Sequence, residues 1–286
     1  MKKRTVLLLA LCLFLLTACA GTGTPAPGGT PSDPDLESAG SEGTQPAVIE
    51  DGPPWFATFR IVDGAETGQL VLVENGDTGS GIYTLSLDQL NFEFQLAEPL
   101  CSGQLINVYF ETVMETYPAQ FGGVSAVELV EGGFDDRAAL YLDVLEDLWE
   151  VDSGLNDGVE VIGVDLSQTS LTPAEQAAVA WVFAGNHGAE LVEGTLEDLM
   201  DQGYITGDPL GTEDAPSDAK FWHWENGCHF SITEQPMEGT YSLTPVTFDA
   251  MKWRSSLGAY FFSDCTAVQS ALGEWSEYRI GAEMIS

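Results

Sequence analysis

The spacing of apolar residues changes twice along the chain, and these changes restrict the folds it can form. Residues 55–132 contain short runs rich in β-branched and aromatic residues, separated by turn sequences such as Asp63-Gly64. From Phe134 the apolar residues recur at helical spacing, and residues 221–286 return to short strands. Strands followed by helices and then by strands again predict an α+β fold overall.

The first strand-rich segment, residues 55–132, predicts a small antiparallel β-barrel-like domain, because about five or six strands fit into it. The predicted strands are 56–62, 69–73, 82–87, 104–110 and 124–130. The motif Tyr117-Pro118-Ala119-Gln120 follows a Val-Tyr strand and resembles part of a small OB-like β-barrel domain of unknown function in Gram-positive bacterial lipoproteins. That family has no assigned catalytic residues, so the resemblance implies none here.

Residues 133–286 predict an α+β domain in which three helices pack on an antiparallel sheet. The first helix, 135–150, places apolar side chains on one face and carboxylates off that face. The second, 172–186, begins at Thr172-Pro173-Ala174-Glu175, which combines an N-cap threonine, a proline in the first turn and a capping-box glutamate. The third helix is 195–202, and Gly203 is placed to end it.

The sheet of this domain is predicted from a hairpin and a meander. Asn226-Gly227 is favoured in two-residue type I′ turns, so the chain from Phe221 to Ile232 predicts a β-hairpin. Three further strands are predicted at 159–165, 246–254 and 259–266, and a fourth at 275–285. Residues 145–158 and 248–286 are similar to a tail of the β-lactam-sensor type of antirepressor metallopeptidases, which implies an extracytoplasmic, non-catalytic accessory module.

The predicted hairpin contains the candidate site. Its register places Trp222, Trp224 and His229 on one face of the sheet, and His223 and Cys228 on the other. The two histidines therefore cannot share one metal ion, and no metal site is predicted. The aromatic face is a candidate ligand-binding platform for a sugar or a peptide, and packing beneath helices is the alternative.

The N-terminus has the features of an export signal. Three basic residues precede an apolar run from Val6 to Leu16, which is shorter than the roughly 20 residues that a membrane-spanning helix needs. Leu16-Thr17-Ala18-Cys19 resembles the lipobox of bacterial lipoproteins. The resemblance implies cleavage after Ala18, a diacylglycerol on Cys19, and attachment to the extracytoplasmic face of the cell membrane. An ordinary secreted protein is the alternative.

The segment after Cys19 predicts a disordered tether. Residues 20–54 hold seven of the 14 prolines and seven glycines, but no aromatic residue. Such a composition offers too little apolar surface to form a core. The folded part is therefore expected to begin at Trp55.

The charge of the chain excludes one class of partner. It has 9 basic and 45 acidic residues, and removal of the signal takes three of the basic ones, which leaves a net charge of −39. Nucleic acid is repelled by such a chain. The partners expected are the membrane, through the lipid on Cys19, and an unidentified ligand or protein of the cell envelope.

Three cysteines remain after signal removal and lipidation: Cys101, Cys228 and Cys265. An odd number allows at most one disulfide within the chain. A disulfide between Cys228 and Cys265 is one prediction, because both fall in the C-terminal sheet. Three buried free thiols are the alternative.

These features favour a non-catalytic binding or sensing module held outside the membrane. Hydrolase motifs such as Gly-x-Ser-x-Gly and His-Glu-x-x-His are missing from the sequence. Ser217-Asp218-Ala219-Lys220 has a Ser-x-x-Lys spacing without its partner motifs, and residues 152–158 fit a solvated turn better than a calcium loop. No catalytic residue or cofactor is predicted. The alternative function is a cell-envelope hydrolase that cleaves glycan or peptide through carboxylates.

Overall fold

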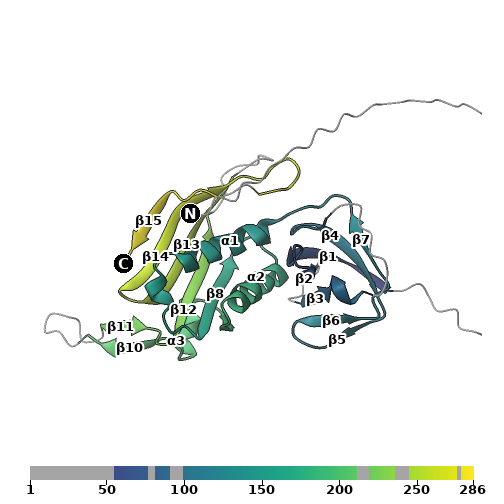
Figure 1. Cartoon of the computed structure of the whole chain (residues 1–286). Helices are drawn as coiled ribbons and strands as arrows, with labels where there is room; N and C mark the ends of the chain where they lie inside the picture. Colours follow the sequence, from purple (N-terminus) through teal and green to yellow (C-terminus); the bar gives the residue numbers. More distant parts are fainter. Residues whose placement is uncertain (1–54, 77–80, 91–98, 211–218, 236–244, 276–277) are drawn as a thin grey trace, which may run out of the picture. The chain divides into compact units, whose positions relative to one another are not determined.

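The computed structural model describes residues 55–76, 81–90, 99–210, 219–235, 245–275 and 278–286. In these residues the protein has an α+β fold made mostly of sheet, with three α-helices (Figure 1). Residues 50–286 form one compact unit. The export signal, Ala18, Cys19 and the tether lie outside the described residues. None of the described helices has the length and apolar character needed to span a membrane.

The first sheet contains seven of the described strands, in the order β5-β6-β3-β2-β1-β4-β7. Their bounds are β1 Trp55–Asp63, β2 Gln69–Glu74, β3 Ile82–Ser86, β4 Leu105–Phe110, β5 Thr112–Met114, β6 Ala119–Gly122 and β7 Ala126–Val130. A short 3-10 helix, Leu87–Gln89, follows β3. The five strands predicted here are confirmed, whereas β5 and β6 were not predicted. The order of described strands runs from β5 to β7 as an open path, so a closed barrel is not confirmed.

Strand β2 is buried on both faces, and this explains what the first sheet packs against. Leu70 and Leu72 point into a core made by the first sheet itself. Val71 and Val73, which alternate with them, belong to a larger core that also holds residues of the helices and of the second sheet. The apolar run in β2 therefore joins two cores.

The second sheet is mixed rather than antiparallel. Its strands are β8 Val161–Gln168, β9 Glu190–Glu193, β10 Thr206–Pro209, β11 Lys220–His223, β12 Gly227–Glu234, β13 Val246–Ser255, β14 Gly258–Ala267 and β15 Ala282–Ile285. Strands β12, β8 and β9 are parallel, which corrects the predicted antiparallel sheet. The reason is that a helix lies between β8 and β9 in the chain, and such a crossover returns the chain in the same direction. The predicted antiparallel meander is present as β13-β14-β15.

The three α-helices match their predictions closely. They are α1 Arg137–Glu150, α2 Pro173–Asn186 and α3 Leu196–Asp201, and a 3-10 helix at Ser153–Asn156 follows α1. The Thr172 hydroxyl accepts from the Glu175 amide, and the Glu175 carboxylate accepts from the Thr172 amide, as a capping box requires. Thr195 and Asp198 form a second capping box at α3.

The predicted hairpin around Asn226-Gly227 is wrong. Strands β11 and β12 do not pair with each other; each pairs antiparallel with β13, so both run in the same direction. Trp224 donates its amide to the carbonyl of Arg254 at 2.9 Å, which keeps the chain on β13 as it leaves β11. The turn preference of two residues is outweighed by the hydrogen bonds that β12 makes with strands on both of its sides.

Arg60 of β1 links the first sheet to the start of α2. Its Nη1 atom donates to the carbonyl oxygens of Gly103 (2.9 Å), Gly133 (2.9 Å) and Asp135 (3.3 Å). Its Nε lies 3.3 Å from a carboxylate oxygen of Glu175, and both side chains are only 14% exposed. The other oxygen of Glu175 serves the helix cap, so one carboxylate joins the sheet to the helix.

Two basic residues of β13 perform a similar role at the end of α1. The buried Lys252 ammonium donates to three carbonyl oxygens, those of Trp149 (3.2 Å), Val151 (2.9 Å) and Asp152 (3.3 Å). Burial lowers the pKa of Lys252. Arg254 donates in the same way to carbonyl oxygens of the loop after α1 and of Glu225. Cations are thus used to satisfy main-chain carbonyls where the helix ends.

Replacing Arg60 with methionine is expected to lower the free energy of unfolding of residues 50–286 by about 2–3 kcal/mol, because three carbonyls and a half-buried carboxylate lose their partner. Urea denaturation followed by circular dichroism measures this change. Arg279→Met removes the same charge from an exposed residue and should cost less than about 0.5 kcal/mol. Equal losses in the two variants would show that net charge, rather than the link to α2, is responsible.

Candidate functional site

The three aromatic candidates come together, but in a packed core. Trp224 and His229 are each 1% exposed, and Trp222 is half-buried at the edge of the same cluster. Ring atoms of Trp224 and His229 would lie 2.9 and 3.1 Å from a Cβ placed on Gly163, so the two rings meet above that glycine. Leu199 of α3 closes the cluster from the helix side. Ligand binding by this trio stays a prediction, and its two inner rings have no exposed face.

The environment of His229 is that of a neutral core histidine. Its Nε2 donates to the carbonyl oxygen of Gly194 at 3.0 Å. Burial lowers the pKa of His229, which favours the uncharged ring. His223 lies on β11, with Nδ1 3.9 Å from a carboxylate oxygen of Asp208. Among the described residues, no group of three or more His, Cys, Asp or Glu side chains could hold a metal ion.

The predicted disulfide between Cys228 and Cys265 is not formed. Both thiols are free and buried, and Cys101 is free and exposed. Cys265 lies opposite Phe248 of β13, whereas Cys228 precedes the residue opposite Trp253. Along β13 the two cysteines are therefore about six residues apart, or about 20 Å at about 3.3 Å per residue, and a disulfide needs Cα atoms within about 7 Å.

The structure supports no functional site at two other motifs of the sequence, the Ser-x-x-Lys motif and the segment 152–158. Ser217 and Asp218 lie outside the described residues, and Lys220 of the same motif begins strand β11. The segment 152–158 begins with Asp152 in the left-handed region and continues as a 3-10 turn, which agrees with a solvated turn.

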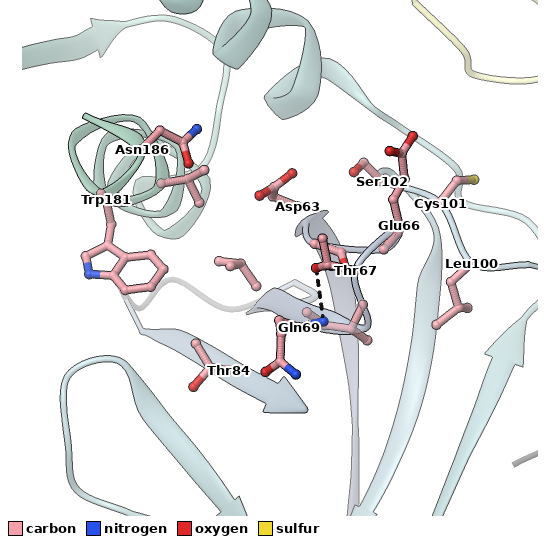
Figure 2. Close-up of a pocket in the computed structure, with 16 residues that line it drawn as sticks. Asp63, Glu66, Thr67, Gln69, Thr84, Leu100, Cys101, Ser102, Trp181 and Asn186 are labelled. Carbon is pink, nitrogen blue, oxygen red and sulfur yellow. Dashed lines mark hydrogen bonds between the residues drawn. The ribbon is translucent and has the colours of Figure 1, made fainter. Parts of the chain in front are cut away.

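A cavity of about 870 Å³ lies elsewhere, between the β1–β2 turn and the second half of α2. Its polar lining comes from Asp63, Glu66, Thr67, Gln69, Thr84, Cys101, Ser102 and Asn186. Its apolar lining comes from Ala65, Leu70, Val71, Leu100, Trp181 and Val182. Figure 2 shows Trp181 and Asn186 extending from α2 on one side of the space, and Asp63, Glu66 and Ser102 on the other.

The β1–β2 turn holds its polar groups in fixed positions. Gly64 has a φ of +83°, and a Cβ there would clash with the carbonyl of Gln69, so the turn needs glycine. Both the amide and the hydroxyl of Thr67 donate to the carbonyl of Gly64, at 3.2 and 3.1 Å. The Thr67 hydroxyl in turn accepts a hydrogen bond from the main-chain amide of Gln69 at 3.3 Å (Figure 2). These bonds hold the turn in the shape that forms one wall.

The opposite wall is held by contacts between α1 and α2. The Asn186 amide donates to one carboxylate oxygen of Glu146 at 2.8 Å, and His187 Nε2 lies 3.0 Å from the other. The His187 ring stacks on Trp149, with ring centroids 3.9 Å apart. The end of α2, which carries Trp181 and Asn186 into the cavity wall, is therefore anchored on α1.

The cavity is negatively charged. Asp63 and Glu66 contribute carboxylates, and none of the 16 residues that line it in the described structure is Lys, Arg or His. Partial burial, and then the nearby carboxylates of Asp136 and Glu274, raise the pKa of the Cys101 thiol at its edge. A lining of this kind disfavours phosphate or carboxylate ligands and accepts neutral or cationic ones.

Sequence reasoning did not find this cavity. Asp63-Gly64 was predicted only as a turn, and Trp181 only as part of a helix. The cavity forms because residues 63–69 lie beside residues 181–186. No local sequence pattern predicts that these two segments are neighbours. The one available signal was that α2 is apolar on nearly every side, which is typical of a helix covered by more than one neighbour.

The free energy of unfolding is expected to depend on pH through the buried thiol of Cys228. Burial raises the pKa of Cys228 to about 12. The unfolded thiol keeps an ordinary pKa near 9, so it ionises first, and the stability it contributes is complete below pH 9 and is lost between pH 9 and 12. From pH 8 to pH 10 the loss should be about 1.4 kcal/mol.

Urea denaturation of residues 50–286 under reducing conditions, at pH 8, 9 and 10, tests this dependence. The difference in unfolding free energy between the native chain and Cys228→Ala should shrink with pH. Val164→Ala serves as the control, because it also removes buried side-chain volume, on strand β8 beside β12, but takes away no titratable group. A constant difference for Cys228→Ala across this range would contradict the assignment.

No protein-family model, curated protein or solved structure matches the chain, so the interpretation of the site depends on its geometry.

Proposed function

We propose that the protein is a lipid-anchored extracytoplasmic lipoprotein that binds a small ligand in the cavity between the β1–β2 turn and α2. The cavity carries this proposal: its volume of about 870 Å³ is in the range of small-molecule sites, and polar groups converge on it from two separate parts of the chain. The sequence supports the location, through the lipobox-like segment that ends at Cys19. The proposal also includes two resemblances seen in the sequence. Residues 55–132 resemble an OB-like β-barrel domain of bacterial lipoproteins, and residues 145–158 and 248–286 resemble the tail of β-lactam-sensor proteins.

The lining indicates which ligands fit. The indole of Trp181 offers an apolar wall, and the amides of Gln69 and Asn186 and the hydroxyls of Thr67 and Thr84 surround it with donors and acceptors. Apolar walls with a few polar groups are typical of sites for small molecules, and the two carboxylates in this lining disfavour an anionic ligand. A neutral or cationic ligand is therefore expected.

The alternative is a cell-envelope hydrolase. One observation favours it: two carboxylates, those of Asp63 and Glu66, line the same cavity. Paired carboxylates are the machinery of glycoside hydrolysis. Analysis of the bound probe after incubation distinguishes the two functions, because a hydrolase shortens the probe and a binding module leaves it intact.

Replacing Cys19 with serine is expected to release the full-length chain from the membrane, because the thioether to the lipid cannot form. Fractionation of cells that express the protein, followed by immunoblotting, measures the shift from membrane to medium. Cys12→Ser is the matched control and should leave the protein in the membrane fraction. A Cys19→Ser protein that stays with the membrane although its signal segment has been removed would contradict the lipid anchor.

Ligand binding is tested by protection of Cys101 from alkylation in residues 50–286. This unit holds the described cores, and Cys101 is its exposed thiol, whereas Cys228 and Cys265 are buried. We expect N-acetylglucosamine oligomers or spermine to slow the reaction with iodoacetamide, and inorganic phosphate to have no effect. Asp63→Asn and Trp181→Ala should weaken protection about tenfold, which corresponds to about 1.4 kcal/mol.

Asp88→Asn is the matched control for Asp63→Asn, since Asp88 is exposed and lies outside the cavity lining. It should leave protection unchanged. Protection by phosphate, or protection that survives Trp181→Ala, would place the ligand somewhere other than this cavity.

A further inference from the structure

A second hollow lies beside the cavity, where polar side chains of the first sheet share one face. The second hollow has a volume of about 410 Å³ and shares Gln69 and Thr84 with the first. Figure 2 shows these two side chains at one border of the first cavity, below Trp181. The two hollows are therefore adjacent, and we treat them together as one groove, which offers more length than a single monosaccharide needs.

The strand register explains why polar side chains line the second hollow. Gln69 of β2 lies directly opposite Ser86 of β3, and Thr84 of β3 lies directly opposite Gln120 of β6. Thr84 and Ser86 are two residues apart, so all four side chains point to the same face of the sheet. The side-chain amide of Gln69 donates to the Ser86 hydroxyl at 2.8 Å, which holds Gln69 and Ser86 in place.

On this face of the sheet, the residues near α2 are apolar, and the residues farther from α2 are polar. Val71 of β2, on the same face as Gln69, is buried in the core that includes α2. Beyond it the amides and hydroxyls of the four polar residues cross three strands. Neighbouring strands lie about 4.8 Å apart, so the polar row extends about 10 Å from β2 to β6. A bound chain can therefore continue past the first cavity.

The chemistry of the groove changes along its length. The first cavity has two carboxylates, whereas no charged side chain lines the second hollow in the described structure. The indole of Trp181 lines the first cavity, whereas the ring of Phe121 in the second hollow packs into the core of the first sheet against Phe59 and Tyr83. Amides and hydroxyls match the hydroxyl groups of sugars, and aromatic rings offer surface for the C–H faces of pyranose rings.

We propose that the groove binds a neutral polyhydroxylated chain, an oligosaccharide of at least two sugar units, with one end in the first cavity and the other along Gln120. This proposal rests on the proposed binding function and names its ligand class. A basic peptide or polyamine is disfavoured, because its charges would meet carboxylates only in the first cavity. An anionic polymer is excluded by the carboxylates there.

The experiment is isothermal titration calorimetry of residues 50–286 with N-acetylglucosamine and β-1,4-linked glucose oligomers of increasing length. For at least one series we expect the dissociation constant to fall about tenfold or more from the monomer to the tetramer and then to level off. Gln120→Ala should remove most of that gain and leave monomer binding unchanged. Trp181→Ala should weaken binding of all lengths.

Gln202→Ala is the matched control, since Gln202 is an exposed glutamine at the end of α3, outside both hollows. It should bind oligomers as the native chain does. Circular dichroism of each variant verifies that it is folded. Gln120 is exposed on a short strand, so its replacement should not disturb the core.

Two results would overturn the proposal: affinity that does not depend on oligomer length in either series, or a length dependence that Gln120→Ala leaves intact. The proposed binding function can be distinguished from it. If no oligomer binds but spermine protects Cys101 in a way that requires Asp63 and Trp181, the cavity is a binding site for another ligand class. If neither oligomer nor spermine binds, both proposals fail.

Discussion

The ion pair between Arg60 and Glu175 is the interaction on which the arrangement of the site depends. The guanidinium belongs to β1, and the carboxylate belongs to the first turn of α2, where it also closes the capping box. The same guanidinium holds two carbonyls of the connection that leads to α1, those of Gly133 and Asp135, and the carbonyl of Gly103 just before β4. One side chain thus holds the start of α2 against β1, and the cavity lies between the second half of α2 and the β1–β2 turn.

Basic residues are rare in this chain, and the structure uses several of them internally. Arg60, Lys252 and Arg254 each donate to main-chain carbonyls at places where a helix or a loop ends. The surface is consequently left with a large excess of carboxylates, given 45 acidic and 9 basic residues in the whole chain. This excess and the anionic lining of the cavity act in the same direction, because both repel anions.

The sequence predicted those elements whose signals are local. The capping box at Thr172 and the strand predicted at 69–73 are both present, because each depends on residues a few positions apart. The hairpin at Asn226-Gly227 failed for the opposite reason: β12 gains partners in β8 and β13, and these distant strands outweigh a local turn. The cavity could not be predicted for the same reason, since Gln69 and Trp181 are joined only by the packing of α2.

Helix α2 shows how such a site could be anticipated in another chain. Eight of its 14 residues are buried, and they lie around most of its circumference rather than in one stripe. A surface helix needs only one apolar face, so a helix like this must be covered on several sides. It contacts β8 on one side and β1 and β2 on another. Trp181 is only half-buried because it lies where these two contacts leave a gap, and a large aromatic residue in such a gap becomes the wall of a cavity.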